Sequence, residues 1–165
     1  MGRAVMALLA IVGAAAACTH AKPNYQQELR RISTGLSLTL ETAGKTVITG
    51  APLVVVVCVC NTSAQQIHAC VARGTSLRII PRDGTDRPLL WYGATLPPTC
   101  EQEVSLAPAS CLRRPETVQI PTFLSGHVQL AGWLQVSCAP PSYHECGDAT
   151  IQGVVPLTLV PATNQ

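Results

Sequence analysis

Thiol and imidazole groups are the side chains of this sequence best suited to chemistry. The stretch PLVVVVCVCNTSAQQIHAC carries Cys58, Cys60, Cys70 and His68 in a very apolar run. Such side chains are the usual zinc ligands, but structural zinc sites draw mostly on C-x2-C pairs, which this stretch lacks. Cysteines of exported proteins are more often disulfide-bonded. Disulfides are therefore the favoured interpretation.

The seven cysteines of the later chain are all disulfide candidates. They are Cys58, Cys60, Cys70, Cys100, Cys111, Cys138 and Cys146. Short spacing predicts that Cys100 pairs with Cys111 and that Cys138 pairs with Cys146, each pair closing a loop between strands. Because the number is odd, at least one of the seven is left unpaired if Cys18 is not a partner.

The valine-rich run predicts a strand in which Cys58 and Cys60 point to the same side. Two such cysteines cannot easily bond each other. One of them is expected to pair with Cys70 across a hairpin connection, and the other to be free or buried.

The N-terminus has the order of an export signal. Arg3 precedes an uncharged apolar run that ends in small residues, as in secretory signals. The run, residues 4–17, is too short to span a bilayer comfortably, since a spanning helix needs about 20 residues. We therefore expect residues 1–17 to be a signal peptide, residues 18–34 a polar tether, residues 35–161 one domain and residues 162–165 a tail.

The sequence AAAC at residues 15–18 resembles the lipobox of bacterial lipoproteins, although Ala15 stands where leucine is usual. The resemblance implies lipidation of Cys18 and a membrane partner through this anchor. The residue after Cys18 is Thr19 and not aspartate, and in this respect the sequence resembles lipoproteins that are sent to an outer membrane. Ordinary cleavage and secretion as a soluble protein is the alternative.

The chain from residue 35 onward alternates apolar and polar residues in short runs. Runs such as LSLTLE, IHACV and HVQLAGWLQVSC are separated by turn formers that include many of the 12 glycines and 13 prolines. Short alternating runs with regular turns are typical of an antiparallel sandwich or barrel. The prediction is an all-β protein.

Residues 42–63, TAGKTVITGAPLVVVVCVCNTS, resemble the first half of bacterial immunoglobulin-like domains, including those of the intracellular proteinase-inhibitor type. The resemblance implies an immunoglobulin-like antiparallel β-sandwich with Greek-key connections. It implies nothing about a ligand.

Residues 132–146, GWLQVSCAPPSYHEC, resemble the copper loop of cupredoxins, which are also β-sandwiches. By position, Cys138 and His144 would be ligands in that loop and His68 the earlier histidine of a trigonal copper site. The spacing from Cys138 to His144 is long for such loops, and no methionine follows Met6 as an axial ligand. A copper or redox protein of the envelope is thus the alternative function.

Three aromatic residues are candidates for binding a partner. In HVQLAGWLQVSC the alternation places Trp133 on the face opposite the core, and Trp91 and Tyr92 lie together in another run. Large exposed aromatic side chains are typical anchors of protein interfaces. Coverage by another part of the chain is the alternative explanation.

Composition and motifs exclude several classes of function. The 11 Lys and Arg, less Arg3, nearly balance nine Asp and Glu, whereas a nucleic-acid partner would require a strongly basic surface. No nucleophile elbow, zinc-protease helix, phosphate loop or dinucleotide fingerprint is present, so we expect no enzyme and no cofactor. The sequence predicts a lipid-anchored envelope protein with a non-catalytic binding or structural role, and a possible protein partner in the envelope.

Overall fold

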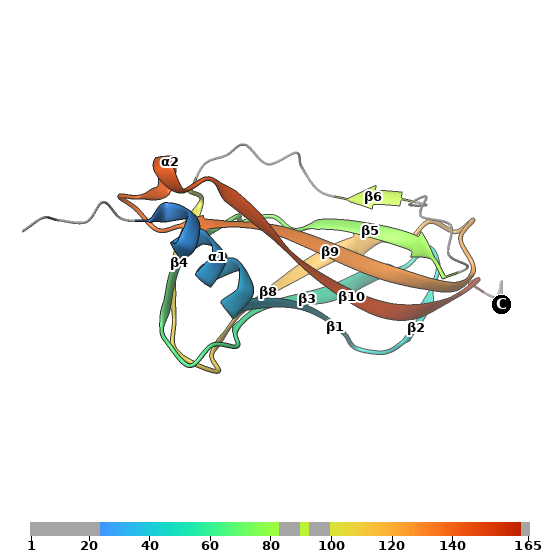
Figure 1. Ribbon diagram of the computed structural model, residues 1–165. Coiled ribbons are helices and arrows are strands. Elements are labelled where there is room, and N and C mark those ends of the chain that lie inside the picture. Colours follow the sequence, from blue (N-terminus) through green and yellow to red (C-terminus); the bar gives the residue numbers. More distant parts are fainter. Residues whose placement is uncertain (1–23, 83–89, 93–99, 163–165) are drawn as a thin grey trace, which may run out of the picture.

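A computed structural model describes residues 24–82, 90–92 and 100–162 of the chain (Figure 1). The expected signal peptide, Cys18 and the last residues of the expected tail lie outside the described residues.

Two sheets form an immunoglobulin-like β-sandwich, which confirms the predicted fold class; the strand pairs are antiparallel except for β2, which pairs in parallel with β10. Sheet A has the strand order β1-β3-β8, with β1 at Leu36–Thr42, β3 at Pro52–Asn61 and β8 at Cys111–Gln119. Sheet B has the order β2-β10-β9-β4-β7, and β5 joins it by pairing with β9 and with β6. Its strands are β2 at Thr46–Ile48, β4 at Ile67–Val71, β5 at Ser76–Pro81, β6 at Leu90–Tyr92, β7 at Gln102–Leu106, β9 at Gly126–Cys138 and β10 at Asp148–Val160.

The core follows from the alternation along the strands. In β3, Val55, Val57 and Val59 are fully buried between the sheets, while Val54 on the other face is about half exposed. β9 places Leu130 and Leu134 in the same core. Because β-branched side chains pack well on a pleated surface, the valine run forms the central strand of sheet A.

The part of the expected polar tether over residues 18–34 that the structure describes is mostly helical. Tyr25–Gly35 form helix α1, which Asn24 caps by accepting a hydrogen bond from the Gln27 amide at 3.1 Å. Tyr25, Leu29 and Ile32 recur at helical spacing on the face that packs against the core, and Ile32 is fully buried. The domain therefore includes α1.

α1 covers the end of the sandwich where sheet B extends beyond sheet A (Figure 1). A second, one-turn helix, α2 at Tyr143–Cys146, lies beside α1 in the connection between β9 and β10. Within the described residues, no helix is long and apolar enough to cross a membrane.

Candidate functional site

Strand register determines how the cysteines pair. Cys60 lies directly opposite Cys111 on β3 and β8, and these two form a disulfide. Cys70 of β4 is bonded to Cys100, which precedes the neighbouring strand β7. The predicted Cys100–Cys111 pair and the predicted bond from Cys58 or Cys60 to Cys70 are therefore wrong, because strand pairing brings Cys111 beside Cys60 and Cys100 beside Cys70.

The other two expectations for the cysteines are confirmed. Cys138 and Cys146 form a disulfide that ties the end of β9 to α2. Cys58 is a free thiol and is buried, as expected for one of the two cysteines on this face of β3.

An ion pair above sheet A buries Cys58. Cys58 lies on the outer face of β3, between β1 and β8, yet it is only 1% exposed. Arg113 of β8 reaches across β3 to Glu41 of β1, with Nη1 to Oε1 at 3.2 Å and a second contact between Nη2 and Oε2. The Cys58 thiol donates to Glu41 Oε1 at 3.4 Å. Burial first, and then Glu41, raises the pKa of this thiol, so it stays protonated and unreactive near neutral pH.

We expect the Glu41–Arg113 pair to control alkylation of Cys58. Glu41→Gln breaks the ion pair with Arg113 and removes the charge that holds the proton on sulfur. Iodoacetamide should then modify native Cys58 at least about tenfold faster, the factor that one unit of thiol pKa provides. Mass spectrometry of peptides after timed alkylation locates the label.

Glu28→Gln is the matched control, because it breaks the other ion pair of the described residues, Glu28–Arg31, and leaves Cys58 covered. Equal labelling rates for the parent protein and the Glu41→Gln variant would contradict the shielding role of the ion pair.

The copper ligands suggested by the sequence do not form a copper site. His68 and Cys138 do line one groove beside α1, together with Glu28, Arg31 and Ser142. However, Cys138 is bonded to Cys146, so its sulfur is not a thiolate ligand, and the side chain of His144 lies outside the described residues. Within the described chain no three His, Cys, Asp or Glu side chains gather in a way that could hold a metal ion.

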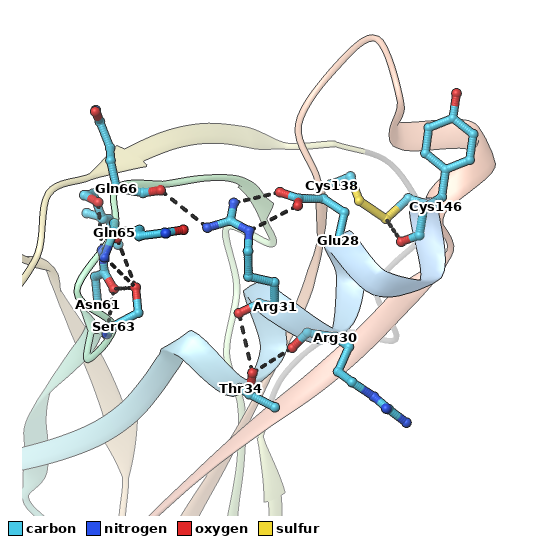
Figure 2. Close-up of polar contacts among 12 residues, drawn as sticks. Glu28, Arg30, Arg31, Thr34, Asn61, Ser63, Gln65, Gln66, Cys138 and Cys146 are labelled. Atoms are coloured by element: carbon cyan, nitrogen blue, oxygen red, sulfur yellow. Dashed lines mark hydrogen bonds and ion pairs between the residues drawn. A yellow bond between two sulfur atoms is a disulfide. The ribbon is translucent and has the colours of Figure 1, made fainter. Parts of the chain in front are cut away.

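Figure 2 shows what occupies this end of the molecule. The Arg31 guanidinium binds both carboxylate oxygens of Glu28, at 2.6 and 3.0 Å, and Nη1 also donates to the Gln66 carbonyl at 3.4 Å. The hydrogen bonds from Arg31 lower the pKa of the Glu28 carboxyl group. Arg31 therefore holds α1 against the turn before β4 at one side of the groove.

The outer face of sheet B carries the strongest candidate for partner binding. We call it the Trp133 face and define it by six side chains of β5, β9 and β10: Arg78, Gln129, Trp133, Gln135, Gln152 and Val154. As the sequence predicts, Trp133 lies on the side opposite the core, and it is half-buried. The guanidinium of Arg78 lies 4.8 Å from the centre of its ring. Trp and Arg are the residues that most often dominate binding at protein interfaces.

Arg78 is the member of this face that sequence reasoning missed. β5 and β9 pair with Ser76 opposite Trp133 and Arg78 opposite Ala131, so Arg78 reaches Trp133 diagonally. Trp91 of β6 lies opposite Arg78 in the register, and Tyr92 lies opposite Leu77. The side chains of Trp91 and Tyr92 lie outside the described residues. The strand register thus places Trp91 and Trp133, two of the three predicted aromatic residues, on strands next to Arg78.

Comparisons with known proteins give fold likeness at low identity. No family model matches the chain, and no curated protein matches it. Among solved structures, a CARDB domain from Pyrococcus furiosus in complex with di-metal ions is 11% identical, with a TM-score of 0.40 over 76% of this chain and 87% of that one.

Spo0M, a sporulation control protein from Bacillus subtilis, is 12% identical with a TM-score of 0.44, over 78% of this chain and 50% of that one. An ASH or PapD-like domain of human CEP192 is 13% identical with a TM-score of 0.33, over 98% and 99%. At these values the likenesses bear on neither ligand nor partner.

Proposed function

We propose that this chain is an exported, non-catalytic binding protein, anchored to the cell envelope by a lipid on Cys18. The observation that carries the proposal is the state of the cysteines. Six of the seven described cysteines are in disulfides, and the seventh, Cys58, is covered by Glu41 and Arg113. Disulfides on this scale are typical of oxidising compartments outside the cytosol.

The same arrangement supports lipidation. Cys58, the free thiol among the described residues, is buried and so is not offered to Cys18 as a disulfide partner, which agrees with the lipidation that the lipobox-like AAAC implies. α1 begins shortly after Cys18 and lies at the opposite end of the sandwich from β2 and the C-terminal end of β10 (Figure 1). An anchor on Cys18 would leave the Trp133 face along the side of the molecule accessible to a protein partner.

Mass spectrometry of the mature protein from membranes tests the anchor. The expected N-terminal peptide begins at Cys18 and carries the added mass of a diacylglycerol, with or without an amide-linked acyl chain. Cys18→Ser should abolish this mass and release the protein from the membrane fraction. An unmodified Cys18 in the mature parent protein would refute the anchor while leaving the binding role open.

Photo-crosslinking in living cells tests the binding face. A photoreactive amino acid at Gln152, which is exposed beside Trp133, is expected to give a discrete adduct with an envelope protein. The same amino acid at Thr39, which is exposed on the outer face of sheet A, should give none. Trp133→Ala should remove the adduct without changing the thermal midpoint by more than a few degrees. Adducts of equal yield at both positions, or adducts that survive Trp133→Ala, would contradict the assignment.

A further inference from the structure

Sheet B is interrupted where β9 changes its partner. β4 pairs with β9 up to Val71 opposite Val136, and β5 resumes the pairing at Ser76 opposite Trp133. Residues 72–75 connect the two strands outside the ladder, apart from one hydrogen bond from the Ala72 amide to the Gln135 carbonyl. The carbonyl groups at this interruption therefore need partners from elsewhere in the fold.

Arg114 supplies those partners from the other sheet. It lies on the inward face of β8, the edge strand of sheet A, and Nη1 donates to the carbonyls of Ala72 and Arg73 at 2.8 and 2.7 Å. One end of the guanidinium is thus fixed. Burial lowers the pKa of Arg114, and the charges of Glu116 and Glu101 oppose this effect.

The rest of the guanidinium has no hydrogen-bond partner. Arg114 Nε and Nη2 are buried and unpaired, and so is Oε1 of Glu116, two residues along the same face of β8. Thr75, at the end of the interruption, is 4% exposed and its hydroxyl is also unpaired. A buried polar group without a partner costs roughly 1–3 kcal/mol, and more when it is charged, so a ligand or water that pairs with these atoms would be stabilised.

The chemistry of these unpaired atoms favours one kind of ligand. Nε and Nη2 form the side edge of a guanidinium, the pair of parallel donors that binds a carboxylate in a bidentate manner. Glu116 adds an acceptor two residues from Arg114 on the same strand, where the two Cα atoms are about 6.6 Å apart. The set therefore requires an acceptor pair and a donor on one small group.

We propose that Arg114 and Glu116 form a binding site for a carboxylate that carries a neighbouring amine or amide N–H. The carboxylate would pair with Nε and Nη2 of Arg114, and the N–H would donate to Oε1 of Glu116. Arg114 and Glu116 are each partly exposed as whole residues, and β8 is an edge strand, so the group can enter from the β8 side. Two sources have this chemistry, a free amino acid and the carboxyl end of a peptide. The site lies apart from the Trp133 face, and its failure would leave the proposed function intact.

Titration followed by NMR of the arginine side chain tests the site directly in the mature, disulfide-bonded protein. Glycine, glycylglycine and acetate are added in turn while the Nε–Hε resonance of Arg114 is followed. Glycine or glycylglycine is expected to shift this resonance saturably, and acetate to bind at least about tenfold more weakly because it leaves Glu116 unpaired, a penalty of about 1.4 kcal/mol. If glycine saturates the shift, the natural ligand is a free amino acid. If only glycylglycine does so, the natural ligand is the carboxyl end of a peptide.

Two variants separate binding from folding. Glu116→Gln should bring the affinities for glycine and acetate to within about threefold of each other, because the charged acceptor is lost. Arg113→Lys is the matched control on the outer face of the same strand and should leave both affinities unchanged. If none of the three probes shifts the Arg114 resonance in the parent protein, water alone occupies the site and the proposal is wrong. The backbone amide of Thr75 serves as a second reporter. If glycine shifts this amide resonance equally in the parent protein and in the Arg114→Lys variant, the proposal is also wrong.

Discussion

Asn61→Asp is expected to destabilise the protein by about 3–5 kcal/mol, the range for leaving an uncompensated charge in a buried site. Asn61 ends β3 and is 1% exposed. Its amide nitrogen donates to the carbonyls of Gln65 and Leu106 at 2.8 and 2.9 Å, while its amide oxygen accepts from the amide and hydroxyl of Ser63 at 2.9 and 2.8 Å. Figure 2 shows this cluster beside the turn. The substitution keeps the shape but turns a donor into an anion that faces two carbonyl oxygens.

The effect should depend on pH in a defined direction. Burial beside carbonyls raises the pKa of the introduced carboxyl above its unfolded value of about 3.9. The folded variant then binds more protons than the unfolded chain, so its stability relative to the parent protein rises as the pH falls from 7 toward 4. Urea denaturation at a series of pH values measures this difference.

Two controls separate charge from lost hydrogen bonds. Asn61→Ala loses the same bonds without adding a charge, so its cost of roughly 2–3 kcal/mol should not vary with pH relative to the parent protein. Gln65→Glu adds a charge at an exposed position of the same turn and should cost little. A flat pH profile for Asn61→Asp would show that the site admits water and that the charge is solvated.

The fold could be predicted because it depends on local patterns, which the sequence displays. Alternation in β9 marked its buried face correctly, including the outward position of Trp133. α1 was underestimated for a physical reason. Its sequence is polar apart from Tyr25, Leu29 and Ile32, and nothing local reveals that sheet B leaves an end uncovered which this narrow apolar stripe can fill.

The cysteine pairing and the buried arginine depend on strand order, which the sequence does not display. Cys60 and Cys111 are separated by 51 residues but lie opposite each other, because β8 returns beside β3 after four strands of the other sheet. Arg114 reads as a surface residue of a polar run, and its contacts with Ala72 and Arg73 exist only because sheet B is interrupted at that point. Sites that form between distant segments were therefore the ones that sequence reasoning missed.

Gly153→Ala is expected to be the most damaging single-methyl addition in the described core. Gly153 of β10 lies directly opposite Gly132 of β9, and both face sheet A. A Cβ at Gly153 would overlap the carbonyl oxygen of Leu38 and lie 2.9 Å from its carbonyl carbon. These are backbone atoms of β1, and β1 is paired with the central strand β3, where Leu38 lies opposite Val59. They cannot move without shifting one sheet against the other, so the cost should be about 3 kcal/mol or more, at or above the usual range for overpacking.

Gly132→Ala is the matched control because it adds the same methyl group at the paired position. Its nearest neighbours would be the side-chain ends of Leu40 and Leu77 at 3.1–3.2 Å, which can adjust by changing rotamer. The reduced freedom of the unfolded chain offsets part of the strain by about 0.4–1 kcal/mol, so the net change should stay within about 1 kcal/mol. Urea midpoints of the two variants, measured with disulfides intact, test this. If Gly153→Ala costs no more than Gly132→Ala, then β1 and β10 do not approach as closely in solution as this packing requires.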